Sequence, residues 1–263
     1  MRLQILMTLY VRRVVNTEVN WSDLYRGKDI QIDDDITLRH PTLDDICDYG
    51  ERQYAVLVNQ LCAVGADLKW QLNDVGIDYT KVEDFELFYS YTVNILASID
   101  TSIMFGDLDF SSFKPIFSEE LDEPVLYSMD SDIMISRYTY QSITTNVRAM
   151  NMLKRNSEIP ANEETRIVLI EEAKEIYERN KDVPYNPRLI NEVSALLNSG
   201  KSSETYNTVF SLPVYVFYNH LKRANRVIKS NLLLQSGYSG FGINLKELNE
   251  TEKKELDWCG NIN

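Results

Sequence analysis

The chain has 263 residues, 44% of them apolar, and a formal net charge of −13. This length and this apolar fraction suit a globular protein of one large domain or two small ones. The acidic balance argues against nucleic acid as a general partner, because a phosphate backbone calls for a net basic face.

The N-terminal part of the chain is expected to combine a short hairpin with helices. Residues 1–29 are interpreted as an N-terminal arm, in which 3–15 fit a strand or a short helix. The next part, 30–104, begins with apolar residues that alternate with polar ones on both sides of the acidic run 33–35, which predicts a hairpin. Helical spacing of apolar residues then follows in three segments, 42–64, 66–75 and 82–96.

Local signals mark the ends of these helices. Thr42 can cap the first one, with Asp44 and Asp45 where the helix dipole favours anions. Gly50 is expected to be tolerated within this helix, whereas Gly76 is expected to end the next one. The third segment is apolar nearly all round, which predicts a central buried helix.

The pattern of apolar and polar residues changes after residue 104. A β insertion is expected over 105–136, because glycine, proline and short apolar pairs replace the helical period there. A C-terminal helical part with a glycine-rich tail is expected over 137–263. Its helices are predicted at 138–153, 163–180, 187–198, 214–235 and 249–258. The fold class that follows is α+β, mainly α with a minor β component.

The helix over 214–235 carries the candidate binding residues. One side is an apolar stripe that includes Phe217 and Leu232, and the other side is basic. Two interpretations of the basic side stay open: the cations pair with the protein's own acids, or they dock an acidic partner segment. The candidate partner-binding residues are Lys222, Arg223, Arg226, Lys229, Tyr215 and Tyr218.

No catalytic, cofactor or metal site is predicted. Gly200 lies at the end of a predicted helix and lacks the earlier glycine of a phosphate-binding loop, so it is interpreted as a helix C-cap. His40 and His220 fall in different elements and have no neighbouring ligand residues. Cys47 and Cys62 lie in an apolar helical pattern, which favours buried, reduced thiols. No run reaches about 18 apolar residues, so no membrane-spanning helix is predicted.

Several segments together resemble proteins encoded in the tail modules of bacteriophages of Gram-positive hosts. They are residues 36–51 (ITLRHPTLDDICDYGE), 76–88 (GIDYTKVEDFELF), 104–110 (MFGDLDF), 233–240 (LLQSGYSG) and 244–246 (NLK). The likeness covers most of residues 30–258. These motifs carry no catalytic residues, and the proteins concerned are similar to tail-assembly chaperones or to minor structural proteins of the virion.

The resemblance leads to a first hypothesis of a non-enzymatic tail-assembly protein that binds a component such as the tape-measure protein through helical and aromatic surfaces. A second hypothesis is a structural subunit of the virion, in the tail, connector or baseplate. A third is a small-molecule enzyme of unknown class. The expected partners are other phage tail or virion proteins, or further copies of this chain, with no nucleic acid, membrane or cofactor. The expected location is the host cytoplasm during assembly, or the virion itself.

Overall fold

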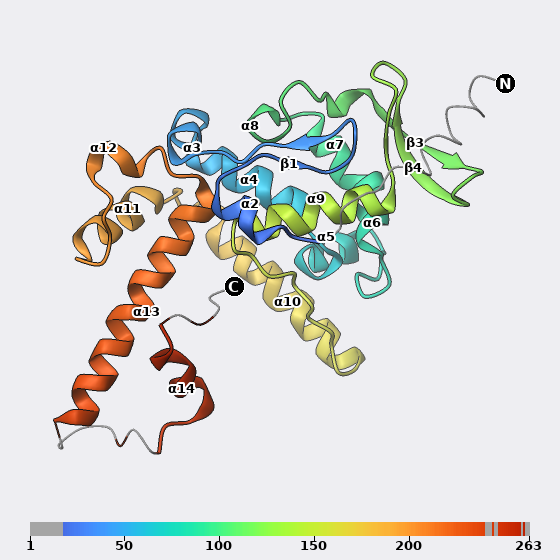
Figure 1. The fold of residues 1–263 in the computed structure, drawn as a ribbon. Coiled ribbons are helices and arrows are strands. Elements are labelled where there is room, and N and C mark those ends of the chain that lie inside the picture. The colour runs from blue at the N-terminus through green and yellow to red at the C-terminus, as the bar shows by residue number, and fades with distance from the viewer. Residues whose placement is uncertain (1–17, 240–243, 245–246, 259, 261–263) are drawn as a thin grey trace.

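The computed structural model describes residues 18–239, 244, 247–258 and 260, so the predicted strand or helix at 3–15 lies outside the described residues. The model is 55% helical with 9% strand, which confirms the predicted α+β class with mainly helical content. Figure 1 shows a helical body from which a small β-sheet and two long helices extend.

The elements of the first half follow in chain order. They are α2 (Trp21–Tyr25), β1 (Ile30–Gln31), β2 (Thr37–Leu38), α3 (Leu43–Tyr49), α4 (Glu51–Cys62), a 3-10 turn (Gly65–Asp67), α5 (Lys69–Asp74), α6 (Asp84–Leu87), a π-helical turn (Phe88–Thr92), α7 (Val93–Leu96) and α8 (Ser102–Phe105).

The second half contains the larger sheet and the longest helices. Its elements are a 3-10 turn (Phe110–Ser112), β3 (Phe113–Ser118), β4 (Glu123–Ser128), β5 (Ile133–Ile135), α9 (Arg137–Met150), α10 (Glu163–Asn180), α11 (Leu189–Asn198), α12 (Tyr206–Val209), α13 (Val214–Tyr238) and α14 (Glu250–Leu256).

The predicted helix over 42–64 is divided at Gly50. Thr42 caps α3 as expected: its hydroxyl accepts a hydrogen bond from the N–H of Asp45 at 3.2 Å, and the Asp45 carboxylate accepts one from the N–H of Thr42 at 2.8 Å. Gly50 ends α3 and begins α4 with a φ of 102°, a backbone conformation that glycine adopts without steric cost. The expectation that Gly50 is tolerated inside one continuous helix was therefore wrong.

The segment formed by α6, the π-helical turn and α7 is the predicted central helix. Phe85, Phe88, Val93 and Leu96 are all buried in the main core, whereas Tyr91 is 45% exposed. The π-helical turn adds a residue to the helical repeat and rotates the residues after it. Burial is thus confirmed for this segment, although it does not extend all round the helix.

Both predicted β regions form antiparallel sheets. In the small hairpin, β1 pairs with β2 with Ile30 opposite Leu38. The insertion is a three-stranded sheet in the order β3-β4-β5, with β4 in the centre. Leu126 and Ile135 of this sheet are fully buried in the same core as the helices, so the insertion is packed onto the body.

The main core draws residues from nearly every part of the described chain. It includes Leu24 of the predicted N-terminal arm, Leu57 of α4, Val147 of α9 and Phe217 of α13. Cys62 is half-buried, and burial raises the pKa of its thiol to about 11. Cys47 is exposed on α3, so the predicted burial of both cysteines was wrong for this one.

Two long helices project from the same side of the body. Figure 1 shows α10 and α13 extending downward from it in the view, with α14 beside the far half of α13. On α10 the one buried residue among those described is Ile170, which packs in a second small core with Leu72 of α5. We call α13 with the segment 247–258 and Gly260 the C-terminal arm.

Candidate functional site

The first turn of α13 is embedded in the body. The four residues Val214–Phe217 are all buried, which covers every side of the helix at this end. The N–H of Val214 donates to the carbonyl of Pro41 at 2.9 Å, and the N–H of Tyr215 donates to Nε2 of His40 at 3.3 Å. Tyr215 is 2% exposed and its ring lies 6.0 Å from that of Trp21. Tyr215 therefore anchors the helix, and the expectation that it belongs to a partner-binding surface was wrong.

His40 occupies the end of the hairpin against this first turn. Burial lowers the pKa of its imidazole to about 4, and the opposing effects of the Asp29 charge and the Lys28 backbone are smaller. The ring is consequently neutral near pH 7, the form in which Nε2 can accept a hydrogen bond.

The two arginines of the basic side hold the end of the arm against α13. Arg226 donates to the carbonyls of Lys254, at 2.6 Å, and Gly260, at 3.1 Å. Arg223 donates to the carbonyls of Trp258 and Gly260. Both arginines thus bind backbone carbonyl groups of α14 and of the residues that follow it.

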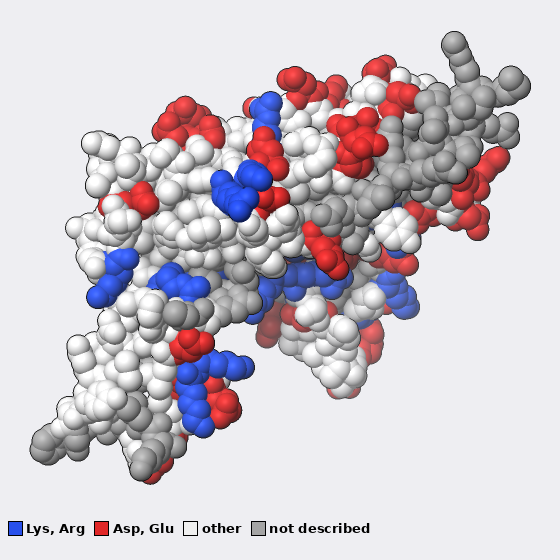
Figure 2. Space-filling model, viewed as in Figure 1, with Lys and Arg blue, Asp and Glu red and all other residues white. Residues whose placement is uncertain are grey.

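The two lysines of the basic side are exposed. Partial burial and the charge of Lys154 lower the pKa of Lys222. In Figure 2, Lys and Arg side chains gather in a band across the middle of the face shown and on the arm below, whereas Asp and Glu dominate the upper edge. Whether Lys222 and Lys229 bind a partner stays a prediction.

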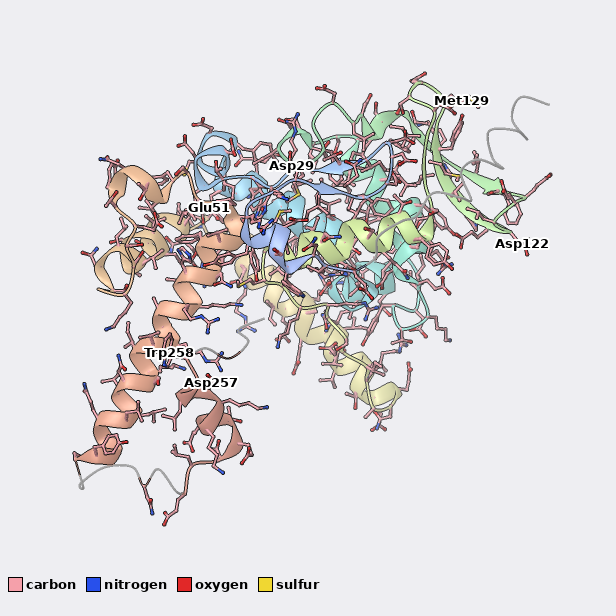
Figure 3. All side chains as sticks on the ribbon, viewed as in Figure 1. Asp29, Glu51, Asp122, Met129, Asp257 and Trp258 are labelled. Atoms are coloured by element: carbon pink, nitrogen blue, oxygen red, sulfur yellow. The ribbon has the colours of Figure 1, made fainter. Side chains whose placement is uncertain are left out.

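Tyr218 lines a hollow of about 250 Å³ between α4, α11 and α13. Burial raises the pKa of its phenol to about 12. In the same hollow the carboxylate of Glu51 accepts hydrogen bonds from the hydroxyl of Tyr185 at 2.8 Å and from the N–H groups of Arg188 and Leu189 at 2.7 and 3.2 Å. Glu51, labelled in Figure 3, therefore caps α11 and fixes the start of α11 against α4.

The C-terminal arm exposes large apolar side chains. Leu232 is 60% exposed, Tyr238 82% and Trp258 56%. After Phe217 the buried residues of α13 are Ala224 and Ser230, and Ser230 donates to the carbonyl of Leu256 at 3.0 Å. The predicted apolar stripe is thus buried only near the body, because the helix extends beyond the core that would cover the rest.

A hollow that the sequence analysis did not predict lies between the start of α6, one face of α9 and Arg155. Its volume is about 590 Å³, within the range of small-ligand sites. The residues of α9 that line it include Arg137, Gln141, Thr144 and Arg148, which lie on one face because their positions follow the helical repeat. We call this the arginine hollow.

Three guanidinium groups surround the arginine hollow, and two of them are paired. Arg155 binds Asp84 through two parallel hydrogen bonds of 2.7 and 2.8 Å. Arg137 binds Glu83 at 2.5 Å and Glu123 at 3.0 Å, and its guanidinium carbon lies 5.8 Å from the centre of the Phe85 ring. These pairs fix α6 and the segment after α9 against the helix.

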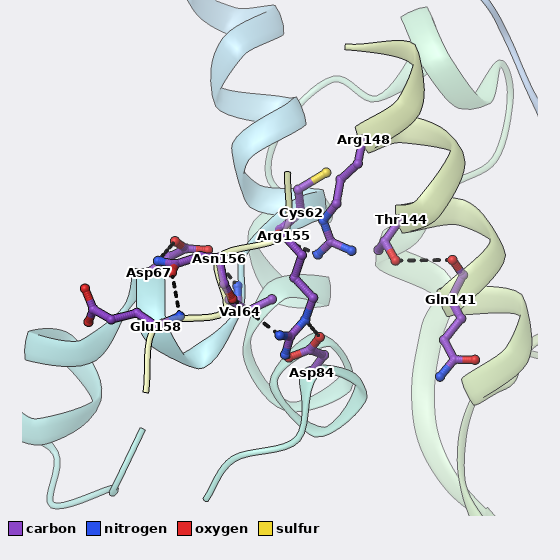
Figure 4. A network of polar contacts seen from close by, with 10 residues as sticks. All are labelled: Cys62, Val64, Asp67, Asp84, Gln141, Thr144, Arg148, Arg155, Asn156 and Glu158. Carbon is purple, nitrogen blue, oxygen red and sulfur yellow. Dashed lines mark hydrogen bonds and ion pairs between the residues drawn. The ribbon is translucent and has the colours of Figure 1, made fainter. Parts of the chain in front are cut away.

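Arg148 differs from the other two arginines of the hollow. Its Nη2 donates to the backbone carbonyl of Cys62 at 2.8 Å, and within the described part of the chain it forms no ion pair. Figure 4 shows the side chain extending from α9, with its guanidinium between the Cys62 segment and Thr144. The sequence feature that could have indicated this hollow is the polar face of α9, whose other face carries Ile143, Val147 and Met150.

Acidic residues also surround a hollow of about 510 Å³ between the β1–β2 hairpin and the turn that joins β4 to β5. Its wall includes Asp29, Asp35, Asp107, Asp109 and Asp130. Among the residues that the structure describes, no group of three or more His, Cys, Asp or Glu side chains is placed to hold a metal ion.

Gly200 follows α11 with a φ of +65°, as expected for a helix C-cap.

Comparison of the chain with protein-family models, curated proteins and solved structures finds no match. The helices in the described segments are all too short or too polar to cross a bilayer.

Proposed function

We propose that the protein is a non-enzymatic tail-assembly protein of bacteriophages of Gram-positive hosts, and that its C-terminal arm binds a tail component such as the tape-measure protein. The observation that carries this proposal is the exposure of Leu232 and Tyr238 on α13, whose other end is anchored in the body, together with that of Trp258 after α14. Large apolar side chains exposed on a segment that extends from the body are typical of protein-binding surfaces.

The shape of α13 suits the holding of an elongated partner. Its 25 residues give a helix of about 37 Å, and the first turn is fixed in the core. A helix of this length presents several turns to another helix, and apolar residues on facing turns supply the main part of such a contact. A partner helix that packs along the far half would cover the apolar side chains that the body leaves exposed.

A second candidate function is a structural subunit of the virion. The feature that favours it is the edge strand β3, which among the described residues pairs with β4 on one side alone and carries Phe117 at 60% exposure. Figure 3 places Asp122 and Met129 at the two ends of the projecting hairpin, and Met129 is 83% exposed. An edge of this kind can pair with a strand of a neighbouring subunit.

Mass spectrometry of purified phage particles separates the two functions. A tail-assembly protein that acts before polymerisation is expected in infected cells and absent from finished particles. A structural subunit is expected in the particles in a fixed ratio to the major tail protein, and that result would contradict the first proposal.

A further inference from the structure

The arginine hollow is a second feature with the chemistry of a binding site, and it is separate from the apolar surface of the arm. Arg137 and Arg155 are each held by carboxylates, so their charges are compensated within the protein. Arg148 contributes a third guanidinium that lines the hollow and whose described partner is the neutral carbonyl of Cys62. Among the described residues, Arg148 is thus the guanidinium of the hollow that no carboxylate pairs with, although the three arginines and the carboxylates of Glu83, Asp84 and Glu123 balance in charge.

Uncharged polar groups of α9 line the same hollow as Arg148. The side-chain amide of Gln141 lines the same hollow from an exposed position one helical turn before Thr144, and Thr145 adds a hydroxyl. The hydroxyl of Thr144 donates its hydrogen to the carbonyl of Gln141, so the donors left for a ligand are the Gln141 amide and the Thr145 hydroxyl. A guanidinium, an amide and a hydroxyl together form a set that recognises an acceptor with two oxygens.

The guanidinium of Arg148, which has no carboxylate partner among the described residues, favours a singly charged ligand. A phosphate group with two charges would meet one uncompensated guanidinium and, across the hollow, Glu83 and Asp84. A carboxylate carries one charge and matches the planar fork of a guanidinium with two parallel hydrogen bonds. The bond from Nη2 of Arg148 to Cys62 fixes the guanidinium before any ligand arrives, which lowers the entropic cost of binding.

We propose that the arginine hollow binds a carboxylate, with Arg148 as the residue that pairs with it and Gln141 as a neighbouring donor. Two sources share this chemistry: a free organic acid, and an acidic side chain of a peptide segment. The volume of about 590 Å³ accommodates either one. This binding site would exist whether or not the arm binds a tail component.

The test titrates the full-length protein with glutarate, with an acetylated tetraglutamate peptide and with inorganic phosphate, and follows the backbone amide signals of Thr144 and Arg148 by NMR. Saturable shifts with a Kd of about 1 mM or tighter are expected for at least one carboxylate probe, with weaker binding of phosphate. Saturation by the peptide alone identifies an acidic segment as the ligand, and saturation by glutarate alone identifies a small acid.

Gln141→Glu is the informative variant, because Gln141 is exposed and the change leaves the Arg148–Cys62 bond in place. A carboxylate introduced into the lining of the hollow repels an anionic ligand and should weaken its binding by roughly tenfold or more. Gln235→Glu on α13 makes the same chemical change at another exposed helical glutamine and should leave binding unchanged. The proposal is overturned if no carboxylate probe saturates, if phosphate binds more tightly than both, or if the two variants weaken binding equally.

Discussion

The imidazole of His40 accepts a hydrogen bond from the backbone N–H of Tyr215, which lies 175 residues further along the chain. The amides in the first turn of a helix have no partner within the helix, and Pro213 at the N-cap has no side-chain hydroxyl or carboxylate to offer. A side chain distant in sequence therefore caps α13 at the point where the C-terminal arm leaves the body. The contact connects the N-terminal hairpin with the helix that we propose binds the partner.

The stability of the protein should depend on pH through His40. Its pKa is about 4 in the folded protein and about 6.5 when the chain is unfolded, so the unfolded state binds the extra proton first. As the pH falls from about 6.5 to about 4, this group should remove about 3 kcal/mol from the free energy of unfolding, and that loss is absent above pH 6.5.

Urea unfolding at several pH values measures this effect when the wild type is compared with His40→Gln, which keeps an acceptor atom and does not titrate. The difference in the free energy of unfolding between the two proteins should shift in favour of the variant as the pH falls. If the free energy of unfolding fell equally with pH in both proteins, protonation of His40 would not destabilise the folded state, which would contradict this prediction.

Gly27 and Pro213 should tolerate no additional atom between them. Gly27 has a φ of +68°, and a Cβ atom there would lie 2.2 Å from Cγ of Pro213. Gly27→Ala should lower the free energy of unfolding by roughly 2–4 kcal/mol, because backbone strain and a clash at the start of α13 act together. Gly76→Ala is the matched control, since Gly76 has a φ of +78° with no atom within 4 Å of the added Cβ.

The control should lose about 1 kcal/mol, the cost of the backbone strain alone. Denaturant unfolding of both variants gives the two values. Equal losses would indicate that the contact between Gly27 and Pro213 is unimportant for stability.

Arg223 and Arg226 should keep the end of the arm in place. In the double variant Arg223→Glu/Arg226→Glu, carboxylates would face the carbonyls of Trp258 and Gly260, so the contact becomes repulsive. Amides of the α14 segment should then exchange with solvent faster by hydrogen exchange, while those of the core keep their protection. Lys222→Glu, at an exposed position, serves as the control. If exchange in the α14 segment is unchanged in the double variant, contacts other than those of Arg223 and Arg226 hold α14 in place.

Much of the secondary structure follows from local sequence. The predicted helix at 163–180 coincides with α10, since an Asn N-cap and an acidic first turn mark its beginning. The hairpin at Ile30 and Leu38 was predicted from the alternation of apolar residues, and Thr42 was predicted as an N-cap from its place before an acidic first turn. These features depend on interactions within a few residues, which is why the sequence alone shows them.

The binding surfaces could not be predicted from the sequence, because they depend on contacts between residues that are far apart in the chain. Tyr215 lies in a helix with an amphipathic pattern, but the first turn is buried all round because the hairpin and α2 cover it. Arg223 and Arg226 bind backbone carbonyls, which have no sequence signature. The arginine hollow did have a signal in the polar face of α9, but its depth depends on Arg155 and the start of α6, which are distant in sequence.

The central claim, that the C-terminal arm binds a tail component, is tested most directly by a binding measurement with a purified partner. The full chain and its double variant Leu232→Asp/Tyr238→Asp would each be co-expressed with the tape-measure protein of the same phage and purified by a tag on the latter. Both side chains are exposed, so the variant should fold with an unchanged unfolding midpoint. We predict that the wild type co-purifies in a defined ratio and that the double variant is lost; equal recovery of both proteins, or of neither, would contradict the account.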